Sequence, residues 1–403
     1  MRKTALSGLV ALATMLGVAT AAPALATTAR PAALAPADEL FGVSCLSAKN
    51  CVAVGENQNA FGGAGGPLAE LWNGTTWHTV AVKLPSGATM GGLFGVSCLS
   101  AKDCVAVGQA GKTPVNLLAL VETWNGKTWT PRVLATASGV ATGLEGVSCR
   151  SAANCVAVGT FTGGPPSAPA AMPVAEAWNG HKWTESKPPV PKNTEIGELV
   201  GVSCVSAARC MASGVYDTTS GGELALLESW NGKAWTRLKA SVPAGTIDAS
   251  LSSVSCTSAN SCVATGFAST KTGLSSLTDM WNGKAWAHTT VPWPKGTTNE
   301  ELNGVSCTAP DRCVAVGVAD SNLKAVSNTG RAAAATWNGK AWAVTSVPAP
   351  GKGKASLFNK VTCLSATDCV AVGQVGPFES LAGTGLSGFW NGTGWHLVAA
   401  LQE

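Results

Sequence analysis

The sequence is short of the residues from which most enzyme sites are built. Its 403 residues include one tyrosine and four histidines, and only 12% are charged, against about 25% in a typical globular chain. A formal net charge of +4 gives no electrostatic footprint for nucleic acid, so we expect no nucleic-acid partner. With 46% hydrophobic residues, the chain has ample apolar content for a large core, and low charge argues against disorder.

Long apolar runs are missing after the first 22 residues. Arg2 and Lys3 precede an uncharged stretch over 5–22, and Ala-Leu-Ala at 24–26 is the small-x-small pattern that a signal peptidase cleaves. A transmembrane anchor is the alternative, because 18 residues is near the minimum for spanning a bilayer. The cleavage pattern favours a signal peptide over 1–26, cut near Ala26 and Thr27. We therefore expect a secreted, extracellular protein with no membrane span after cleavage.

What the sequence has instead is one motif written seven times. Fourteen cysteines form seven C-x5-C pairs, and the first cysteines of successive pairs are 51 to 56 residues apart. Each pair precedes a W-N-G-x-x-W segment, and fixed periods of this size indicate a solenoid, a propeller or an array. The cysteine pairs are Cys45 with Cys51, Cys98 with Cys104, Cys149 with Cys155, Cys204 with Cys210, Cys256 with Cys262, Cys307 with Cys313 and Cys363 with Cys369. The tryptophan pairs are Trp72 with Trp77, Trp124 with Trp129, Trp178 with Trp183, Trp230 with Trp235, Trp281 with Trp286, Trp337 with Trp342 and Trp390 with Trp395.

Each repeat reads as four short strands, which we call a to d. G-V-S-C at 95–98 and C-V-A-V-G at 104–108 are short apolar runs, and the second ends at a glycine. The stretch before the first tryptophan is the third strand, and Asn-Gly then turns the chain into the fourth, because both residues tolerate positive φ. Four antiparallel strands in about 50 residues describe a propeller blade. We predict a signal peptide, an Ala/Pro-rich linker over 27–40 and an all-β, seven-bladed β-propeller over 41–403, with blades starting near 41, 94, 145, 200, 252, 303 and 359.

The motif resembles the kelch repeat. The points of likeness are a second strand ending in Gly108, a third strand ending in Trp124, a polar turn and then Trp129. The resemblance covers 41–403 and implies the propeller fold of a family that includes galactose-oxidase-type enzymes. The G-K-T-W segment ending at Trp129 also looks like the end of a sialidase-type Asp box, with Trp124 in place of the aspartate. Galactose-oxidase activity needs two tyrosines and two histidines at copper, so Tyr216, the single tyrosine, excludes it.

The cysteines are predicted to form one disulfide within each repeat. An even number at fixed spacing in a secreted chain indicates disulfides, and such short loops contribute about 2 kcal/mol each on the chain-entropy model. Structural zinc is the alternative, but two thiols without nearby histidine would require sites shared between repeats. No cysteine is left over as a catalytic thiol. We expect no metal and no cofactor.

The tryptophan pairs have two interpretations. They form seven sugar-stacking sites, or they pack between blades, which seven near-identical copies at fixed positions favour. An acid two residues before the first tryptophan lies on the same strand face, and we expect it to pair with a lysine after Asn-Gly across the hairpin. The acids are Glu70, Glu122, Glu176, Glu228 and Asp279, and the lysines are Lys127, Lys233, Lys284 and Lys340.

Binding residues are expected where the repeats differ. The segment from the second-strand glycine to the first tryptophan varies in length between repeats. We therefore expect the repeats to differ from one another on the face formed by the b–c loops and d–a connections. Trp293, between two prolines, is either an exposed stacking platform or packed on a neighbouring loop, and Arg331 faces either a ligand or water. The candidates are Glu56, Asn57, Phe161, Tyr216, Asp217, Trp293, Asp320, Asn322, Arg331 and Gln374.

The sequence favours a monomer that binds rather than catalyses. The expected partner is an extracellular glycan or a surface protein. Two alternatives stay open: a glycan-acting hydrolase or lyase that uses Asp or Glu on the same face, and a purely structural extracellular protein. The ring closes either without a shared strand or with residues 32–40 as an added one.

Overall fold

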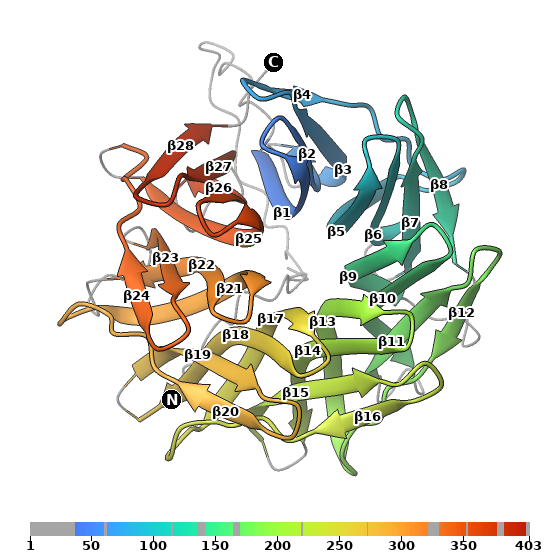
Figure 1. Ribbon diagram of the computed structural model, residues 1–403. Coiled ribbons are helices and arrows are strands. Elements are labelled where there is room, and N and C mark those ends of the chain that lie inside the picture. Colours follow the sequence, from blue (N-terminus) through green and yellow to red (C-terminus); the bar gives the residue numbers. More distant parts are fainter. Residues whose placement is uncertain are drawn as a thin grey trace, which may run out of the picture. The chain divides into compact units, whose positions relative to one another are not determined.

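The structure, a computed structural model, describes residues 37–59, 63–113, 116–134, 142–163, 170–218, 221–271, 273–320, 330–351, 354–376 and 383–399. The predicted signal peptide and Asn322 lie outside these ranges, as does most of the predicted linker. The described residues form 28 strands and no helix, which confirms the all-β class (Figure 1). None of them forms a helix able to cross a membrane.

The strands follow the seven cysteine pairs, four to a repeat, and we number the repeats 1 to 7 in chain order. Repeat 1 contains β1 (Ala37–Ser47), β2 (Asn50–Asn59), β3 (Gly63–Trp72) and β4 (Trp77–Thr79); repeat 2 contains β5 (Met90–Ser100), β6 (Asp103–Gly111), β7 (Leu117–Trp124) and β8 (Trp129–Val133); repeat 3 contains β9 (Thr142–Ser151), β10 (Asn154–Gly163), β11 (Ala170–Trp178) and β12 (Trp183–Ser186); repeat 4 contains β13 (Thr194–Ser206), β14 (Arg209–Thr218), β15 (Glu223–Trp230) and β16 (Trp235–Leu238). Repeat 5 contains β17 (Asp248–Ser258), β18 (Ser261–Thr270), β19 (Gly273–Trp281) and β20 (Trp286–Thr289); repeat 6 contains β21 (Thr298–Ala309), β22 (Arg312–Asp320), β23 (Arg331–Trp337) and β24 (Trp342–Thr345); repeat 7 contains β25 (Ala355–Ser365), β26 (Asp368–Gly376), β27 (Thr384–Trp390) and β28 (Trp395–Ala399).

Within each repeat, the strands pair antiparallel in chain order. Five repeats are separate four-stranded sheets, and repeats 3 and 4 are joined into one eight-stranded sheet by a single parallel pairing of Ala171 with Ile196. β1 begins at Ala37, four residues before the predicted start of the first blade. Because β1 to β4 all come from one stretch of chain, the sheet of repeat 1 needs no strand from the C-terminus.

All seven predicted disulfides form. Each joins directly opposed residues of the first two strands of a repeat, whose Cα atoms are 4.0 Å apart. The bonded pairs are Cys45 with Cys51, Cys98 with Cys104, Cys149 with Cys155, Cys204 with Cys210, Cys256 with Cys262, Cys307 with Cys313 and Cys363 with Cys369.

The second cysteine of every pair is buried. The seven are Cys51, Cys104, Cys155, Cys210, Cys262, Cys313 and Cys369, each at most 4% exposed. Their sulfur atoms therefore belong to the packed interior of the repeats and not to an exposed binding surface. The described residues contain no free cysteine, so these side chains serve as structural cross-links.

The cysteine and tryptophan pairs form one row across each sheet. In repeat 1, Cys45 lies opposite Cys51, Cys51 opposite Trp72, and Trp72 opposite Trp77. The rings of each tryptophan pair lie 5.3–5.6 Å apart. Since Trp77 is 1% exposed and five other second tryptophans are also buried, the packing interpretation is confirmed for them.

A bulge in every first strand explains the glycine of C-V-A-V-G. The pairing of first and second strands shifts by one residue between Leu40 and Gly42, and at equivalent places in the other six repeats. The bulge presses the carbonyl oxygen of Glu39 against Gly55, where a Cβ would collide with it, and the same collision recurs in all seven repeats. The second strand does not end at this glycine, as the sequence suggested, but continues to Asn59 in repeat 1.

Neighbouring repeats are joined through their first strands. In six cases the serine before the first cysteine accepts a hydrogen bond from the backbone N–H of the first cysteine of the next repeat, as Ser44 Oγ does from Cys98 at 3.0 Å. Because these bonds join equivalent positions, the first strands run in the same direction. The disulfide hairpins that these bonds connect therefore lie at one end of the strands, and Figure 1 shows the first strands inside and the fourth strands outside.

The contacts between repeats return to their start. β25 lies against β1, and Asn359 Nδ2 donates to the carbonyl oxygen of Leu40 at 2.9 Å. On the outer side, the indole N–H of Trp77 donates to Ser387 Oγ at 3.0 Å, and Phe389 stacks on Trp72 with ring centroids 4.7 Å apart. Side-chain packing thus joins repeat 7 to repeat 1.

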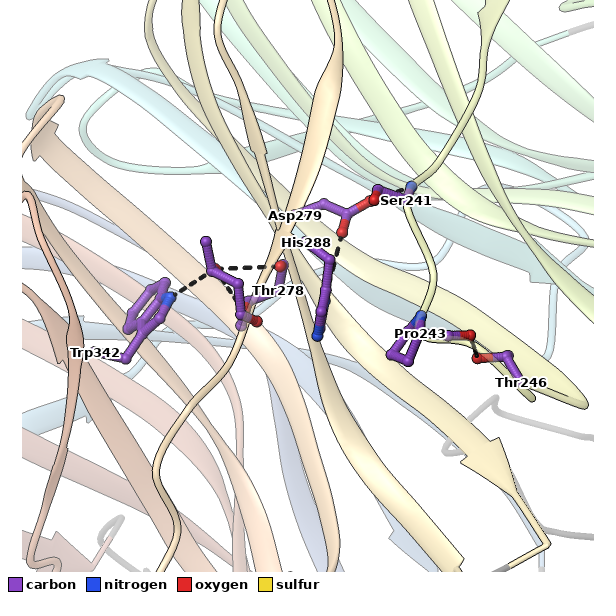
Figure 2. A network of polar contacts seen from close by, with 8 residues as sticks. Ser241, Pro243, Thr246, Thr278, Asp279, His288 and Trp342 are labelled. Atoms are coloured by element: carbon purple, nitrogen blue, oxygen red, sulfur yellow. Dashed lines mark hydrogen bonds and ion pairs between the residues drawn. The ribbon is translucent and has the colours of Figure 1, made fainter.

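The predicted acid–lysine ion pairs are wrong. Glu122 and Glu228 are 0% exposed, and neither carboxylate has a hydrogen-bond partner among the described residues, whereas Lys127 and Lys233 are exposed. In repeat 5, Asp279 instead accepts a hydrogen bond from the backbone N–H of Ser241 at 2.7 Å and lies 3.8 Å from His288 Nδ1 (Figure 2). These acids lie in the packed region between sheets, so they are buried and do not form an ion pair with a lysine across the hairpin.

Candidate functional site

The predicted candidates are spread over the end of the sheets opposite the disulfides. Tyr216 packs partly buried against a cluster that includes Leu199 and Trp235, and the next residue, Asp217, accepts the backbone N–H of Thr218 at 2.7 Å. Phe161 is also partly buried, with Lys187 Nζ 4.7 Å from its ring centroid. These aromatic and acidic side chains are held in place by their own repeats.

Trp293 is anchored at its indole nitrogen. That N–H donates to Ser276 Oγ at 2.8 Å, and the partly buried ring packs against the cluster that contains Val291 and Trp342. Of the remaining candidates, Asn57 Oδ1 accepts the backbone N–H of Gly66 at 2.8 Å. Asp320 is buried and Arg331 is exposed. Gln374 lies on β26, opposite Leu357 on one neighbouring strand and Gly385 on the other.

Charged side chains from four different repeats influence one another at the inner strands. We call Glu39, Glu56, Glu145, Glu198 and Lys360 the central charge cluster. Four of the five lie on first strands, β1, β9, β13 and β25, and Glu56 lies on β2 directly opposite Glu39. All five are partly buried, and Glu56 is the one predicted candidate that belongs to the cluster.

The bulge places Glu145 in this cluster. The residue at this position is Phe41 in repeat 1, Phe94 in repeat 2, Glu145 in repeat 3 and Asn359 in repeat 7, and an unpaired bulge residue is a common way to redirect a side chain. Phe41 and Phe94 meet edge to face with centroids 5.5 Å apart. The bulge position therefore carries aromatic rings in repeats 1 and 2 and polar groups in repeats 3 and 7.

Lys360 occupies a position that is glycine in five repeats. A Cβ at Gly95 would meet the carbonyl oxygen of Glu145 at 2.9 Å, and one at Gly304 would meet Lys360 Cα at 2.9 Å, because the first strands of neighbouring repeats approach closely. At the junction of β25 with β1 a full lysine side chain stands at this position. The closing junction therefore carries a cation where the others carry no side chain or, in repeat 5, Ser253.

Burial and mutual repulsion bring the acids of the cluster toward neutrality. Burial, with the charge of Glu56, raises the pKa of Glu39 to about 7. Burial also raises the pKa of Glu198 to about 7, with repulsion from Glu223. Burial raises the pKa of Glu145 to about 8, with repulsion from Glu198 and Glu56 opposed by attraction to Lys360. Burial lowers the pKa of Lys360 to about 8, against the attraction of Glu145. Near pH 7 the carboxyl groups of Glu39, Glu145 and Glu198 are therefore partly protonated, as groups for acid–base work are.

Sequence reasoning missed four of the five residues, because it looked at loops and not at the first strand. The signal was present: aligning the seven repeats on their first cysteines isolates Lys360 in a glycine column and Glu145 in a column with no common residue. Glu39 and Glu198 share a column in which repeats 2 and 3 carry glycine. Among the described residues, no group of three or more His, Cys, Asp or Glu side chains is placed to hold a metal ion.

Comparisons with known proteins give the fold. No protein-family model matches the sequence, and neither does any curated protein sequence. Among solved structures, an ulvan lyase is 10% identical with a TM-score of 0.54, over 91% of this chain and 94% of that one. A xyloglucanase from Xanthomonas campestris is 14% identical with a TM-score of 0.54, over 93% of this chain and 55% of that one.

These neighbours are β-propeller-like proteins. The chain has the fold of a β-propeller. At such low identity the likeness shows fold alone, since one fold carries many activities, and the kelch resemblance stays a prediction.

Proposed function

We propose that the protein is a secreted, seven-bladed, kelch-like propeller that binds an extracellular glycan or protein partner at the end opposite its disulfides, with the central charge cluster as the core of the site. The observation that carries the proposal is Lys360. A lysine in a column of glycines puts one cation within electrostatic reach of Glu145, which in turn interacts with Glu198 and Glu56 of two further repeats.

The composition of the cluster favours an uncharged or amino-bearing glycan. Four carboxyl groups outnumber the single lysine, and those carboxyl groups that are ionised near pH 7 repel an anionic ligand. Carboxylates accept hydrogen bonds from sugar hydroxyls, and the aromatic edge-to-face pair of Phe41 and Phe94 offers apolar faces for a sugar ring. The end of β14 that carries Tyr216 and the connection that carries Trp293 would then form the rim of the same site.

The test is an array of neutral, amino and acidic extracellular oligosaccharides, probed with the mature protein, with Lys360→Gln and with Lys354→Gln. Lys354 is an exposed lysine just before β25 and is the matched control. We expect neutral or amino glycans to bind the wild type and the control, and at least about tenfold weaker binding by Lys360→Gln, since removing one member of a partly buried charge cluster leaves its partners uncompensated. Equal binding by all three proteins would show that the central charge cluster is not part of the binding site.

A second candidate is a glycan-acting hydrolase or lyase at the same cluster. The pKa values of Glu145 and Glu198, raised to about 8 and about 7, favour it, because a carboxyl that is protonated part of the time at neutral pH can act as a general acid. Release of reducing ends or unsaturated products from a polysaccharide panel, abolished by Glu145→Gln, would support it. Binding of a polysaccharide without release of products would contradict the enzyme function and support recognition alone.

A further inference from the structure

One end of the sheets of this protein carries an excess of positive charge. We call the turns between the paired cysteines and between the paired tryptophans the hairpin face. Each Asn-Gly turn packs on the cysteine hairpin of its own repeat; a Cβ at Gly126, for example, would lie 2.7 Å from the Lys102 side chain. This face carries ten exposed cations, namely Lys49, Lys102, Lys127, Arg150, Lys182, Arg209, Lys233, Lys284, Arg312 and Lys340, against three acids, Asp103, Asp311 and Asp368.

The net charge of the chain hides this asymmetry. The whole sequence sums to +4, yet the hairpin face is strongly basic, while four acids collect in the central charge cluster. A surface of one sign attracts polymers of the opposite sign and raises their association rate, in a manner that salt weakens.

Two clefts open on the hairpin face at equivalent junctions. One lies between repeats 3 and 4 and one between repeats 6 and 7, each of about 320 Å³, at the lower end of the ~300–1,000 Å³ typical of small-molecule sites. Both are lined by the first tryptophans of two adjacent repeats, Trp178 and Trp230 in one and Trp337 and Trp390 in the other.

An arginine stands at each cleft. Arg150 lines the first and Arg312 the second, where Asp311 lies 3.9 Å from it. The Arg312 side chain is 60% exposed, so it is open to a ligand. The lining of the first cleft contains no acid among the described residues.

The residue before the first tryptophan of the earlier repeat lies at the junction in both clefts. It is Ala177 in repeat 3 and Thr336 in repeat 6, and both line their clefts. In repeat 7 it is Phe389, whose ring stacks on Trp72 of repeat 1 and occupies the equivalent space. The small side chains of Ala177 and Thr336 therefore leave room that Phe389 fills at the junction of repeats 7 and 1.

We propose that the hairpin face binds an anionic polysaccharide, with single sugar rings in the two clefts and their carboxylate or sulfate groups on Arg150 and Arg312. A guanidinium pairs with carboxylate or sulfate through two parallel hydrogen bonds, and tryptophan faces suit the apolar side of a sugar ring. The remaining cations attract the polymer between the clefts. This site is separate from the central charge cluster, which lies on the inner strands.

The experiment uses the mature protein and three probes by biolayer interferometry: polygalacturonate, dextran sulfate and neutral dextran, with double-stranded DNA as a fourth. The variant combines Arg150→Gln, Arg209→Gln and Arg312→Gln. The matched control removes three exposed lysines from loops at the other end, by Lys112→Gln, Lys271→Gln and Lys295→Gln.

We expect one or both anionic polysaccharides to bind, neutral dextran not to bind, and affinity to fall by about tenfold or more between 50 and 200 mM salt. The arginine variant should lose at least about tenfold while the lysine control keeps wild-type affinity. Whether polygalacturonate or dextran sulfate binds more tightly assigns the anion as carboxylate or sulfate.

Three results would overturn the proposal. The first is that neither anionic polysaccharide binds at 50 mM salt. The second is that the arginine variant and the lysine control lose the same affinity. The third is that DNA binds as tightly as the polysaccharides, which would show that the face attracts any polyanion. Trp230→Phe tests the first cleft: a loss of polysaccharide affinity in a variant that keeps the wild-type melting midpoint supports a seated sugar ring, since the change also removes the hydrogen bond from the indole to Ala207.

Discussion

The row of cysteines and tryptophans and the inner strands use the same seven-fold repeat in opposite ways. Every repeat keeps its disulfide and its pair of contacting tryptophans. On the inner strands, the residue at the bulge is Phe41 in one repeat, Glu145 in another and Asn359 in a third. A contact confined to one repeat can be copied seven times without cost. Charged side chains that converge from all repeats cannot be identical, since seven like charges would repel one another.

The uniform row should carry more of the stability than any single position in the inner strands. Reducing all seven disulfides, each worth about 2 kcal/mol on the chain-entropy model, is expected to lower the melting midpoint by about 10 °C or more. Thermal melts with and without a phosphine reductant, with thiols counted in the reduced sample, measure the effect. An unchanged midpoint in a sample with fourteen free thiols would show that the tryptophan packing alone holds the hairpins.

The buried acids make the sheet packing sensitive to pH. Burial raises the pKa of Glu122 to about 8 from its ordinary value of 4.5, so the folded state prefers the protonated form. The stabilisation is complete below pH 4.5 and is lost as pH rises through 8. We expect the melting midpoint to fall between pH 5 and pH 9, and Glu122→Gln to be more stable than the wild type at pH 9 by about 1–3 kcal/mol.

At pH 5 the Gln variant and the wild type should melt together, because both side chains are then uncharged. Melting curves in a buffer series at constant ionic strength measure the difference. If the wild type and the Gln variant fall in parallel from pH 5 to pH 9, the carboxyl of Glu122 does not titrate across this range.

The smallest expected effect concerns two repeats in which the indole N–H of the second tryptophan has no hydrogen-bond partner among the described residues. Trp342 (Figure 2) donates its indole N–H to Thr289 of the preceding repeat at 3.1 Å. Trp395 donates in the same way to Thr345 at 3.1 Å. The indole N–H groups of Trp129 and Trp286 are buried and have no partner among the described residues, and the equivalent residues of the preceding repeats are Val80 and Leu238.

Val80→Thr supplies the missing acceptor to Trp129 and should stabilise by about 0.5–1.5 kcal/mol. The reciprocal change, Thr345→Val, removes the acceptor of Trp395 and should destabilise by a similar amount. Denaturant unfolding followed by tryptophan fluorescence measures both. The reverse outcome, destabilisation by Val80→Thr and stabilisation by Thr345→Val, would show that methyl packing and not the hydrogen bond sets the energy at this position.

The sequence by itself determined the features that depend on neighbours within one repeat. C-x5-C predicts a disulfide because two cysteines at that spacing end up directly opposite across a hairpin, as Cys45 and Cys51 do. Asn-Gly between tryptophans predicts the turn before Trp77, and seven copies predict packing over seven separate ligand sites. Each of these rests on short-range geometry that the chain carries locally.

Only the tertiary structure decided what meets across repeats. It buried Glu122 without its expected lysine, pressed carbonyl oxygens against the second-strand glycines, and brought Lys360 to act on Glu145 across more than two hundred residues of chain. It also placed ten cations on one face of a chain whose total charge is +4. The physical reason is that bulges, strand approach and the return of β25 to β1 fix these distances, and no spacing along the sequence encodes them.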